Sequence, residues 1–185
     1  MKFTPTKIPG AYLIEIQPIT DERGFFARSF CADEFQQHGL NSNFIQCNVS
    51  FTSQRGTIRG MHYQVAPDTE TKLVRCTRGA IYDVILDLRP ESPTFKQWVA
   101  AELTSDNHQM FYIPPGCAHG LQTLVDDTEV FYQMAGVYNP SAARGVRWND
   151  PAFGIEMPLA VSVINQRDRD YPDFTDVSQT GKFKL

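Results

Sequence analysis

Apolar and polar residues alternate in short runs along the chain, and turn-forming residues separate one run from the next. The run at 80–89 (AIYDVILDLR) shows the pattern most strongly, and others lie at 8–20, 44–51, 96–103 and 110–114. Because successive side chains of a strand point to opposite faces, such alternation is typical of β-strands. Gly and Pro residues interrupt the chain at roughly ten-residue spacing, as they do in β-sandwiches and barrels. The pattern predicts an all-β domain.

The rest of the chain also fits an all-β domain, and only one short helix is expected. Further strands are expected at 25–30, 56–64, 71–76, 119–124 and 129–138. One short helix is expected at Ala32–His38, because Gly39 follows as a helix-ending residue. From Pro140 the pattern becomes irregular, and the tail at about 173–185 has few apolar residues and is expected to be loosely held.

The length of 185 residues indicates a single domain, 1–185. A chain of this size buries about 70% of its unfolded surface, so it needs no disulfide or metal to fold. The N-terminal strands, within about residues 1–50, carry apolar stretches at 11–16 and 25–30. Strand edges of such composition are usually paired or covered, which predicts a homodimer built partly from these strands. The alternative is a strand that closes its own sheet.

The stretch at 56–76 (GTIRGMHYQVAPDTETKLVRC) concentrates chemically versatile side chains. Alternation along its first strand predicts one face with Ile58, Gly60, His62 and Gln64, and another with Arg59, Met61 and Tyr63. His62 can titrate near neutrality, and Lys72 on the next strand supplies a cation or donor. Aimed into one cavity, the two could deprotonate a carbon beside a carbonyl and stabilise the enolate. The alternative is a core or surface histidine and a strand-edge lysine.

Other candidates are spread along the chain. His119 follows a Pro-Gly turn in IPPGCAHGL, and Asp83 lies among apolar residues, where a lone carboxylate is costly. A buried pair between Asp83 and His119 would remove that cost, and the alternative is an Asp83 that faces solvent. Tyr132 is a core tyrosine or an acid, and Asp168 is one of several acids in a polar loop.

Composition narrows the class of protein. The formal charge of −4 disfavours nucleic acid as a partner, and no apolar run approaches the roughly 20 residues of a membrane helix. The N-terminal sequence MKFTPTKIPGAY lacks the apolar core of a signal peptide, so a cytoplasmic location is expected. The four cysteines are scattered without a CxxC pair, which indicates free thiols and no zinc site.

Nine motifs, in order along residues 8–172, resemble the dTDP-4-dehydrorhamnose 3,5-epimerase family of the cupin superfamily. The motifs are DERGFF (21–26), QCNVS (46–50), GTIRGMHYQ (56–64), KLVRC (72–76), DLRPESPTF (87–95), YIPPGCAHG (112–120), VFYQ (130–133), RGVRWNDP (144–151) and INQRD (164–168). The resemblance implies a cupin-type jelly-roll barrel with short peripheral helices. It also implies a homodimer and a nucleotide-linked 4-keto-6-deoxy sugar as substrate.

The resemblance also implies roles for individual residues. The base would be His62 with Asp168 as its carboxylate partner, the lysine Lys72 and the acid Tyr132. Substrate-binding positions would fall on Arg23, Phe26, Gln46, Asn48, Arg59 and His119, with Tyr138 a further candidate on the face of Tyr132 and Asp83 behind His119. The substrate's own C4 ketone would acidify the hydrogens on C3 and C5, so no cofactor and no metal are expected.

Four positions depart from the family pattern: Arg28, Glu70, Cys117 and Gln133. Glu70 stands where glutamine is frequent, and Cys117 stands where an aromatic residue is usual. These departures leave open whether the nucleotide is dTDP, CDP or GDP and whether one or both centres are inverted. Two further alternatives are a metal-dependent cupin enzyme, disfavoured because Tyr63 and Gln64 follow His62 without an HxH pair, and a non-catalytic sugar-nucleotide binding module.

Overall fold

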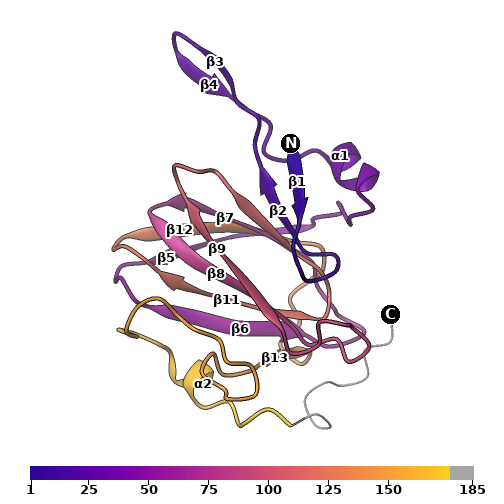
Figure 1. Cartoon of the computed structure of the whole chain (residues 1–185), viewed down its shortest axis with the longest axis vertical. Coiled ribbons are helices and arrows are strands. Elements are labelled where there is room, and N and C mark those ends of the chain that lie inside the picture. The colour runs from indigo at the N-terminus through magenta and orange to yellow at the C-terminus, as the bar shows by residue number, and fades with distance from the viewer. Residues whose placement is uncertain (176–185) are drawn as a thin grey trace.

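The computed structural model describes residues 1–175 and consists of two antiparallel sheets that face each other (Figure 1). The six-stranded sheet has the order β1-β2-β10-β7-β12-β5, and the five-stranded sheet has the order β13-β6-β11-β8-β9. The strands of the first sheet are Lys2–Pro5 (β1), Tyr12–Glu15 (β2), Met110–Ile113 (β10), Lys72–Arg78 (β7), Thr128–Met134 (β12) and Gln46–Thr52 (β5). Those of the second are Ala143–Gly145 (β13), Ile58–Gln64 (β6), Cys117–Thr123 (β11), Ala80–Asp87 (β8) and Trp98–Thr104 (β9).

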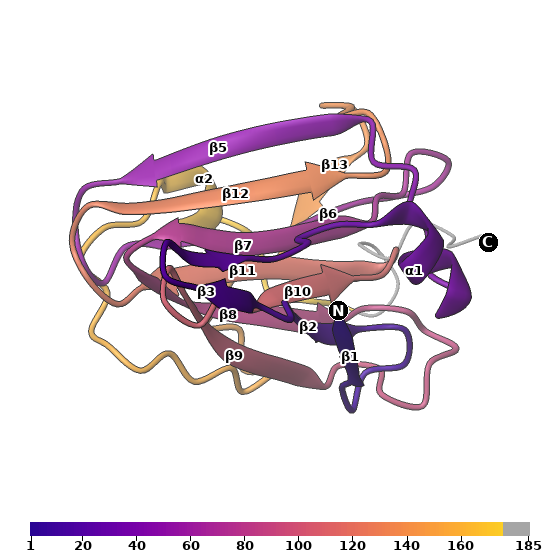
Figure 2. The same ribbon diagram turned by 90° about the horizontal axis from the view of Figure 1, so that it is seen from above.

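The chain passes repeatedly from one sheet to the other, which is the jelly-roll pattern. From β5 to β8 each strand lies in the sheet opposite its predecessor, and the same holds from β9 to β13. In the view from above, the strands of one sheet overlap those of the other (Figure 2). Strand pairing does not join the two sheets within residues 1–175, so the jelly roll is open at its sides. The prediction of an all-β jelly roll is confirmed.

The core follows from the alternation along the strands. On β8, Ile81 and Ile85 point between the sheets and pack against Val74 and Phe111 of the facing sheet. The intervening residues of β8, among them Val84, point outward to a second apolar cluster under the C-terminal segment. A third cluster lies on the outer face of the six-stranded sheet, where Phe35, Leu73 and Met110 pack together. Burial of both faces of β8 explains its almost continuous apolar sequence.

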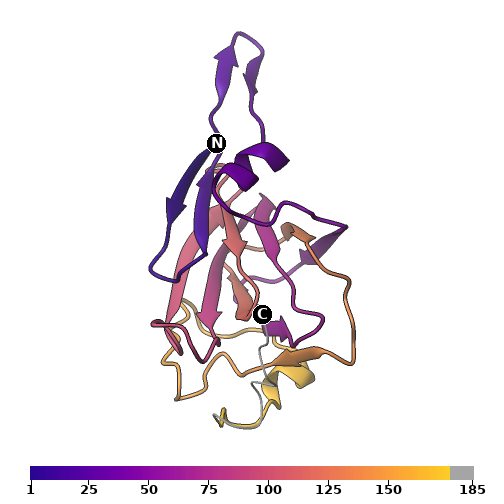
Figure 3. The same cartoon turned by 90° about the vertical axis from the view of Figure 1, so that its right-hand side faces the viewer.

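The N-terminal region differs from the predicted pair of long strands. The run 8–20 contains the short β2 and then the start of a hairpin formed by β3 (Ile19–Asp21) and β4 (Gly24–Phe26). Pro18 has no N–H to donate, so a continuous ladder is interrupted before the hairpin. The hairpin projects away from the two sheets (Figures 1 and 3). The expected helix is confirmed as α1 (Ala32–Gln37), which buries Phe35.

The C-terminal third is more ordered than its irregular pattern suggested. It contributes β13 and a short helix, α2 (Gln166–Arg169), whose start is capped by the Asn165 side chain. The expectation of a loosely held tail does not fit Phe174, which is buried against Phe153 and donates its N–H to Asp150. The rest of that tail, 176–185, lies outside the described residues.

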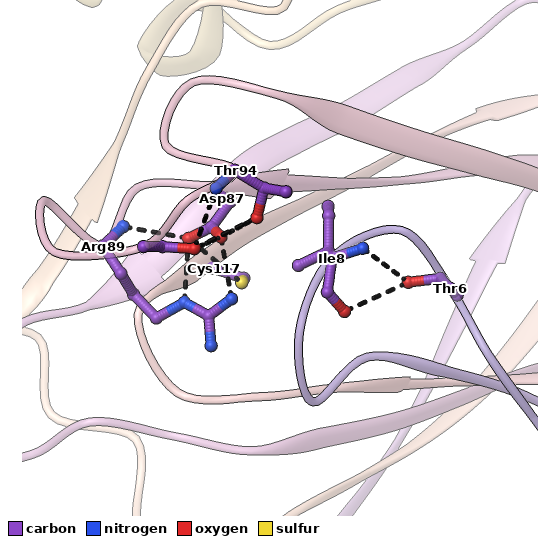
Figure 4. A network of polar contacts seen from close by, with 7 residues as sticks. Thr6, Ile8, Asp87, Arg89, Thr94 and Cys117 are labelled. Atoms are coloured by element: carbon purple, nitrogen blue, oxygen red, sulfur yellow. Dashed lines mark hydrogen bonds and ion pairs between the residues drawn. The ribbon is translucent and has the colours of Figure 1, made fainter.

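A polar network fixes the turn that follows β8 (Figure 4). The buried Asp87 carboxylate accepts hydrogen bonds from the Arg89 guanidinium at 2.7 and 2.8 Å, from Ser92 at 2.6 Å and from Thr94 at 2.7 Å. Burial raises the pKa of Asp87, but these donors outweigh burial and hold the pKa below its ordinary value. The DLRPESPTF motif is therefore a structural element, in which the polar residues satisfy one buried carboxylate.

Candidate functional site

A cavity of about 310 Å³ opens between the two sheets near α2. The five-stranded sheet contributes Arg59, His62 and His119 to its lining. The six-stranded sheet contributes Lys72, Tyr132 and Met134, and the α2 segment contributes Asn165, Arg167 and Asp168. All four residues expected to carry out catalysis therefore meet in one cavity.

His62 and Asp168 form the most tightly defined pair in the cavity. The His62 Nε2 lies 2.6 Å from Asp168 Oδ1, and the carboxylate is fully buried while the imidazole is 40% exposed. The other carboxylate oxygen accepts the Gly60 N–H at 3.1 Å, and the Asp168 N–H is bound by the Asn165 cap at 2.7 Å. The carboxylate is thus fixed from two sides, and it orients an imidazole that remains accessible from the cavity.

A close contact between β6 and β11 determines which side chains of β6 reach the cavity. A Cβ on Gly60 would lie 2.4 Å from the Gly120 Cα, and Gly60 has a φ of +121°, so only glycine fits. The register of the two strands shifts at this point, as at a β-bulge. As a result Arg59 and His62 both line the cavity. The prediction that Arg59 and His62 lie on opposite faces is wrong, because simple alternation does not survive a bulge.

His119 lies opposite His62 on the paired strand and has a carboxylate partner of its own. Its Nε2 lies 2.7 Å from Asp83 Oδ1, and Asp83 is fully buried on β8. The pairing predicted for Asp83 and His119 is present, and the alternative of a solvent-facing Asp83 is wrong. The cavity therefore holds two histidines, each oriented by a buried carboxylate.

Lys72 begins β7 and is nearly buried, with its ammonium close to the strand that carries His62. The Lys72 Nζ lies 2.7 Å from Glu70 Oε1 and 3.4 Å from the backbone oxygen of His62. A buried ammonium requires such oxygen partners because desolvation is otherwise costly. The cation is therefore held between Glu70 and the strand that carries His62, at the lining of the cavity.

Tyr132 lies on β12, in the sheet that faces His62. Its neighbours on the same face, Val130 and Met134, are buried apolar residues that also line the cavity. Burial, followed by the nearby charge of Glu70, raises the pKa of Tyr132 above its ordinary value. The phenol is therefore protonated at neutral pH and can donate a proton from the sheet opposite the His62 imidazole.

Of three further predicted binding residues, Tyr138 lines the cavity, and Gln46 and Asn48 contact a residue that lines it. Gln46 and Asn48 on β5 are within 3.8 and 3.6 Å of the Met134 sulfur, and Met134 lines the cavity. Tyr138 lies after the end of β12, lines the cavity and is 46% exposed, and its N–H is bound by Gln46. The exposed ring of Tyr138 offers a flat apolar surface beside amide donors and acceptors.

Arg23 and Phe26 are not brought to the cavity of their own chain. Both belong to the projecting hairpin, where the Arg23 side chain is 83% exposed and Phe26 is 73% exposed (Figure 1). Arg23 pairs with Asp21 on the same hairpin. Within residues 1–175 neither residue lines the cavity, so a binding role for them requires a second chain.

Two arginines that sequence reasoning did not single out line the cavity as well. Arg144 on β13 and Arg167 on α2 lie at its edge, and Arg167 stacks over the Tyr171 ring at 5.9 Å. Both stand inside motifs that were recognised, RGVRWNDP and INQRD. Two arginines in otherwise polar loops were the available signal, but nothing in their spacing showed that the loops converge.

Of the four departures from the family pattern, only Glu70 lines the cavity within the described residues. Arg28 forms an ion pair with Glu34 near α1, and Gln133 points to the face of β12 opposite Tyr132. Cys117 is buried beside Asp87, and burial raises the pKa of its thiol. None of these three residues therefore belongs to the lining of the cavity that residues 1–175 form.

Residues 1–175 contain neither a membrane-spanning helix nor a cluster of metal-binding side chains. None of their helices has the length and apolar character that a membrane span requires. Their histidine, cysteine and carboxylate side chains form no cluster of three or more with the geometry of a metal site. All four cysteines lie in this part of the chain, and all four are free thiols.

Comparison with known proteins identifies the family. The family model for dTDP-4-dehydrorhamnose 3,5-epimerase matches residues 5–176. The dTDP-4-dehydrorhamnose 3,5-epimerase of Sinorhizobium fredii is 38% identical over 178 residues, which cover 96% of this chain and 91% of that protein. The crystal structure of the Bacillus anthracis enzyme with TDP and PPi bound is 41% identical, with a TM-score of 0.90 over 94% of this chain and 99% of the other.

A third comparison concerns a complex with a sugar nucleotide. The Legionella pneumophila dTDP-6-deoxy-D-glucose-3,5-epimerase, crystallised with dTDP-4-keto-L-rhamnose, is 35% identical, with a TM-score of 0.84. The match covers 91% of this chain and 89% of that one. The match of the family model over almost the whole chain, the identities and the common fold agree. The chain belongs to the dTDP-4-dehydrorhamnose 3,5-epimerase family.

Proposed function

We propose that this protein epimerises dTDP-4-dehydro-6-deoxy-D-glucose at C3 and C5 and releases dTDP-4-dehydro-L-rhamnose. The observation that carries the proposal is the placement of the His62–Asp168 pair and Tyr132 on facing sheets of one cavity. Inversion of a carbon centre requires removal of a proton on one face and delivery on the other, and this arrangement offers a base and an acid on opposite sides. The activity named for the relatives supports the same reaction.

His62 is the proposed base. The hydrogens on C3 and C5 flank the C4 ketone, which acidifies them because the resulting carbanion is delocalised as an enolate. Asp168 binds the Nε2 of His62, so Nδ1 is the nitrogen that can accept the carbon-bound proton. The fixed carboxylate then stabilises the imidazolium that forms, as in other His–Asp pairs. The pair therefore supplies both the orientation and the charge compensation of a general base.

Lys72 and His119 are the proposed stabilisers of the enolate oxygen. Lys72 is held by Glu70, and His119 is held by Asp83. Donors that are already oriented in a nearly buried site stabilise a developing oxyanion without further reorganisation. The ketone serves as the electron sink, so the proposed reaction requires neither a redox cofactor nor a metal ion.

Tyr132 is the proposed acid that returns a proton from the opposite side. Burial keeps its phenol neutral at the pH at which His62 acts as a base. A tyrosinate formed by donation would be re-protonated before the next inversion. In each inversion His62 therefore removes the proton and Tyr132 returns one.

The lining of the cavity suggests how the nucleotide is held. Arg59, Arg144 and Arg167 line the cavity, and guanidinium groups bind diphosphate oxygens with two parallel hydrogen bonds. Tyr138 presents an exposed ring for stacking on a base, next to Gln46 and Asn48. We therefore place the diphosphate at the arginines and the base at Tyr138.

The active species is proposed to be a homodimer. The hairpin carries Ile19, Phe25 and Phe26 exposed, and β5 carries Val49 and Phe51 exposed on the outer face of the six-stranded sheet. Exposed apolar side chains concentrated on a projecting hairpin and a sheet edge are typical of an interface. In such a dimer the hairpin of one chain would bring Arg23 and Phe26 to the cavity of its partner. A cytoplasmic location is part of the same proposal, and four free thiols fit a reducing compartment.

The test of the proposed function compares nucleotides and products directly. Purified protein is incubated with dTDP- and CDP-linked 4-keto-6-deoxyglucose in parallel, and the product sugar is identified by proton NMR. We expect inversion of both centres with the dTDP substrate and slower conversion of the CDP substrate. Inversion at only one centre would show that the protein is a single-centre epimerase. Binding without conversion would identify a non-catalytic module, and activity lost on chelation and restored by a metal would identify a metal-dependent cupin enzyme.

A further inference from the structure

Glu70 lines the cavity and carries a carboxylate oxygen without a hydrogen-bond partner in residues 1–175. One carboxylate oxygen, Oε1, pairs with Lys72 Nζ at 2.7 Å. The other, Oε2, is buried and has no hydrogen-bond partner among the described residues. The Glu70 side chain is only 7% exposed and lines the cavity. Leaving a charged oxygen without a donor is costly in such a place, so the empty acceptor indicates a donor that arrives with a ligand.

The loop that carries Glu70 is fixed by its surroundings. A Cβ on Gly136 would lie 3.2 Å from the Thr69 oxygen and 3.6 Å from the Glu70 Cα, so the two backbones pack closely. The preceding loop residue Asp68 is bound by the Gln64 side chain at 2.9 Å and by Asn139 at 2.8 Å. The Oε2 atom is therefore held in place before a ligand binds, as recognition of a specific group requires.

The chemistry of a carboxylate limits what this oxygen can recognise. An ionised carboxylate only accepts hydrogen bonds, so its ligand must donate one. Neither the C4 ketone nor the diphosphate of a sugar nucleotide can donate, whereas the hydroxyl groups on C2 and C3 of the sugar can. Glu70 lies beside Lys72 and near enough to Tyr132 for its charge to affect the phenol. Glu70 therefore lies beside the residues proposed for catalysis, next to the part of the ligand that those residues would contact.

We propose that Glu70 is a specificity-determining residue that accepts a hydrogen bond from a ring hydroxyl of the bound sugar, on C2 or C3. The proposal rests on the proposed function in that the ligand is a 4-keto-6-deoxy sugar nucleotide. Glutamine, which has one carbonyl oxygen, would use it for Lys72 and present an amide N–H₂ where Oε2 now lies. A carboxylate at this position therefore favours a sugar whose hydroxyl group donates a hydrogen bond. The amide N–H₂ of a glutamine would instead pair with a substituent that only accepts a hydrogen bond.

The test uses inert ligands, so that it does not depend on turnover. Calorimetry measures the Kd values of dTDP-6-deoxyglucose and of its 2-deoxy-2-fluoro and 3-deoxy-3-fluoro analogues, because fluorine cannot donate a hydrogen bond. Wild type, Glu70→Gln and the exposed control Glu102→Gln are compared, with dTDP alone as the reference ligand. Wild type and Glu102→Gln should bind the hydroxyl ligand at least about tenfold more tightly than one of the fluoro analogues. Glu70→Gln should lose most of this preference while its affinity for dTDP is unchanged.

The fluoro analogue that wild type binds more weakly shows whether the C2 or the C3 hydroxyl group donates to Glu70. The proposal is overturned if wild type does not discriminate at either position, or if Glu70→Gln keeps the wild-type preference. It is also overturned if Glu70→Gln weakens all three sugars equally, which is the behaviour of a residue that only positions Lys72. Conversion of dTDP-4-keto-6-deoxyglucose by wild type, measured in parallel, tests the proposed function separately. If wild type does not convert this substrate but still prefers the hydroxyl ligand over a fluoro analogue, the proposed function is contradicted and the role of Glu70 is not.

Discussion

His62 and Asp168 are 106 residues apart in the chain and are joined by a hydrogen bond of 2.6 Å between Nε2 and Oδ1. Asp168→Asn keeps the size of the side chain and can keep the bond to the Gly60 N–H, but it removes the negative charge beside the imidazole. We expect kcat to fall by about 10²- to 10⁴-fold with little change in the melting temperature. Asp170→Asn, an exposed change at the end of the same helix, is the control. Equal activity of wild type and Asp168→Asn would show that the carboxylate only supports the fold.

Tyr132 provides a test that separates proton removal from proton return. In Tyr132→Phe the base remains, so exchange of ring protons with solvent should persist, whereas formation of inverted product should fall by at least about 10²-fold. Exchange and inversion are measured together by proton NMR in D2O. A parallel loss of exchange and inversion would assign Tyr132 to binding or packing. The opposite-face acid would then be sought at Tyr138, which also lines the cavity.

Asp87 gives a prediction about stability and pH. Its pKa is lower in the folded state than in the unfolded chain, so the folded state favours the carboxylate. This contribution is complete above about pH 4, the ordinary value for aspartate, and it disappears as the pH falls through the lower pKa of the folded state. Asp87→Asn should therefore reduce the free energy of unfolding by about 2–4 kcal/mol at neutral pH, and by less at pH 3. The measurement is urea unfolding at both pH values.

The control for this experiment is Asp106→Asn, an exposed change that should be nearly neutral at both pH values. A difference between wild type and Asp87→Asn that does not shrink in acid would mean that the shape of the side chain, and not its charge, stabilises the turn. Activity is not expected to change while the protein is folded, because Asp87 lies outside the cavity lining.

Alternation and turn residues were sufficient to predict the all-β fold, because the sheets are antiparallel and each strand is short. They failed at Gly60, where the close approach of Gly120 shifts the register and brings Arg59 to the face of His62. A bulge of this kind depends on the partner strand, and periodicity within one strand contains no information about it. Sequence reasoning also proposed the pairing of Asp83 with His119, because the cost of burying a lone carboxylate is a local argument.

The parts of the cavity that were missed come from segments with little secondary structure. Arg144 and Arg167 lie on a three-residue strand and a four-residue helix, both too short to leave a periodic pattern. Their position depends on how the C-terminal segment packs over the outer face of the five-stranded sheet through Phe153 and Phe174. Arg23 shows the reverse error. Sequence reasoning predicted that it binds substrate, but the hairpin that carries it projects away from the cavity of its own chain.

Subunit complementation tests whether Arg23 acts in the partner's cavity. Arg23→Ala and His62→Ala are each expected to be inactive, or nearly so, as homodimers. In a mixed dimer, the cavity that retains His62 would receive an intact Arg23 from the other chain. Co-expression with two different affinity tags and purification of the mixed species should therefore restore about half of the wild-type activity per dimer.

The same experiment has a clear opposite outcome. If Arg23 serves the cavity of its own chain, each site of the mixed dimer carries one defect and activity is not restored. A monomeric mass by light scattering at micromolar concentration would contradict the proposed dimer altogether. A mixture of His62→Ala with Asp168→Asn is the matched control, because both residues belong to one cavity. That mixture should remain inactive in any dimer.

His62 is the proposed base that removes the C3 and C5 protons of a 4-keto-6-deoxy sugar bound to dTDP. The most direct measurement is proton NMR of dTDP-4-keto-6-deoxyglucose in D2O with catalytic amounts of wild type and of His62→Ala. Wild type should remove both the C3 and the C5 signals as deuterium is incorporated, and His62→Ala, folded by circular dichroism, should remove neither above the background rate. Persistence of both signals with wild type would show that the protein does not epimerise this substrate, and their loss at the wild-type rate with His62→Ala would show that another group is the base.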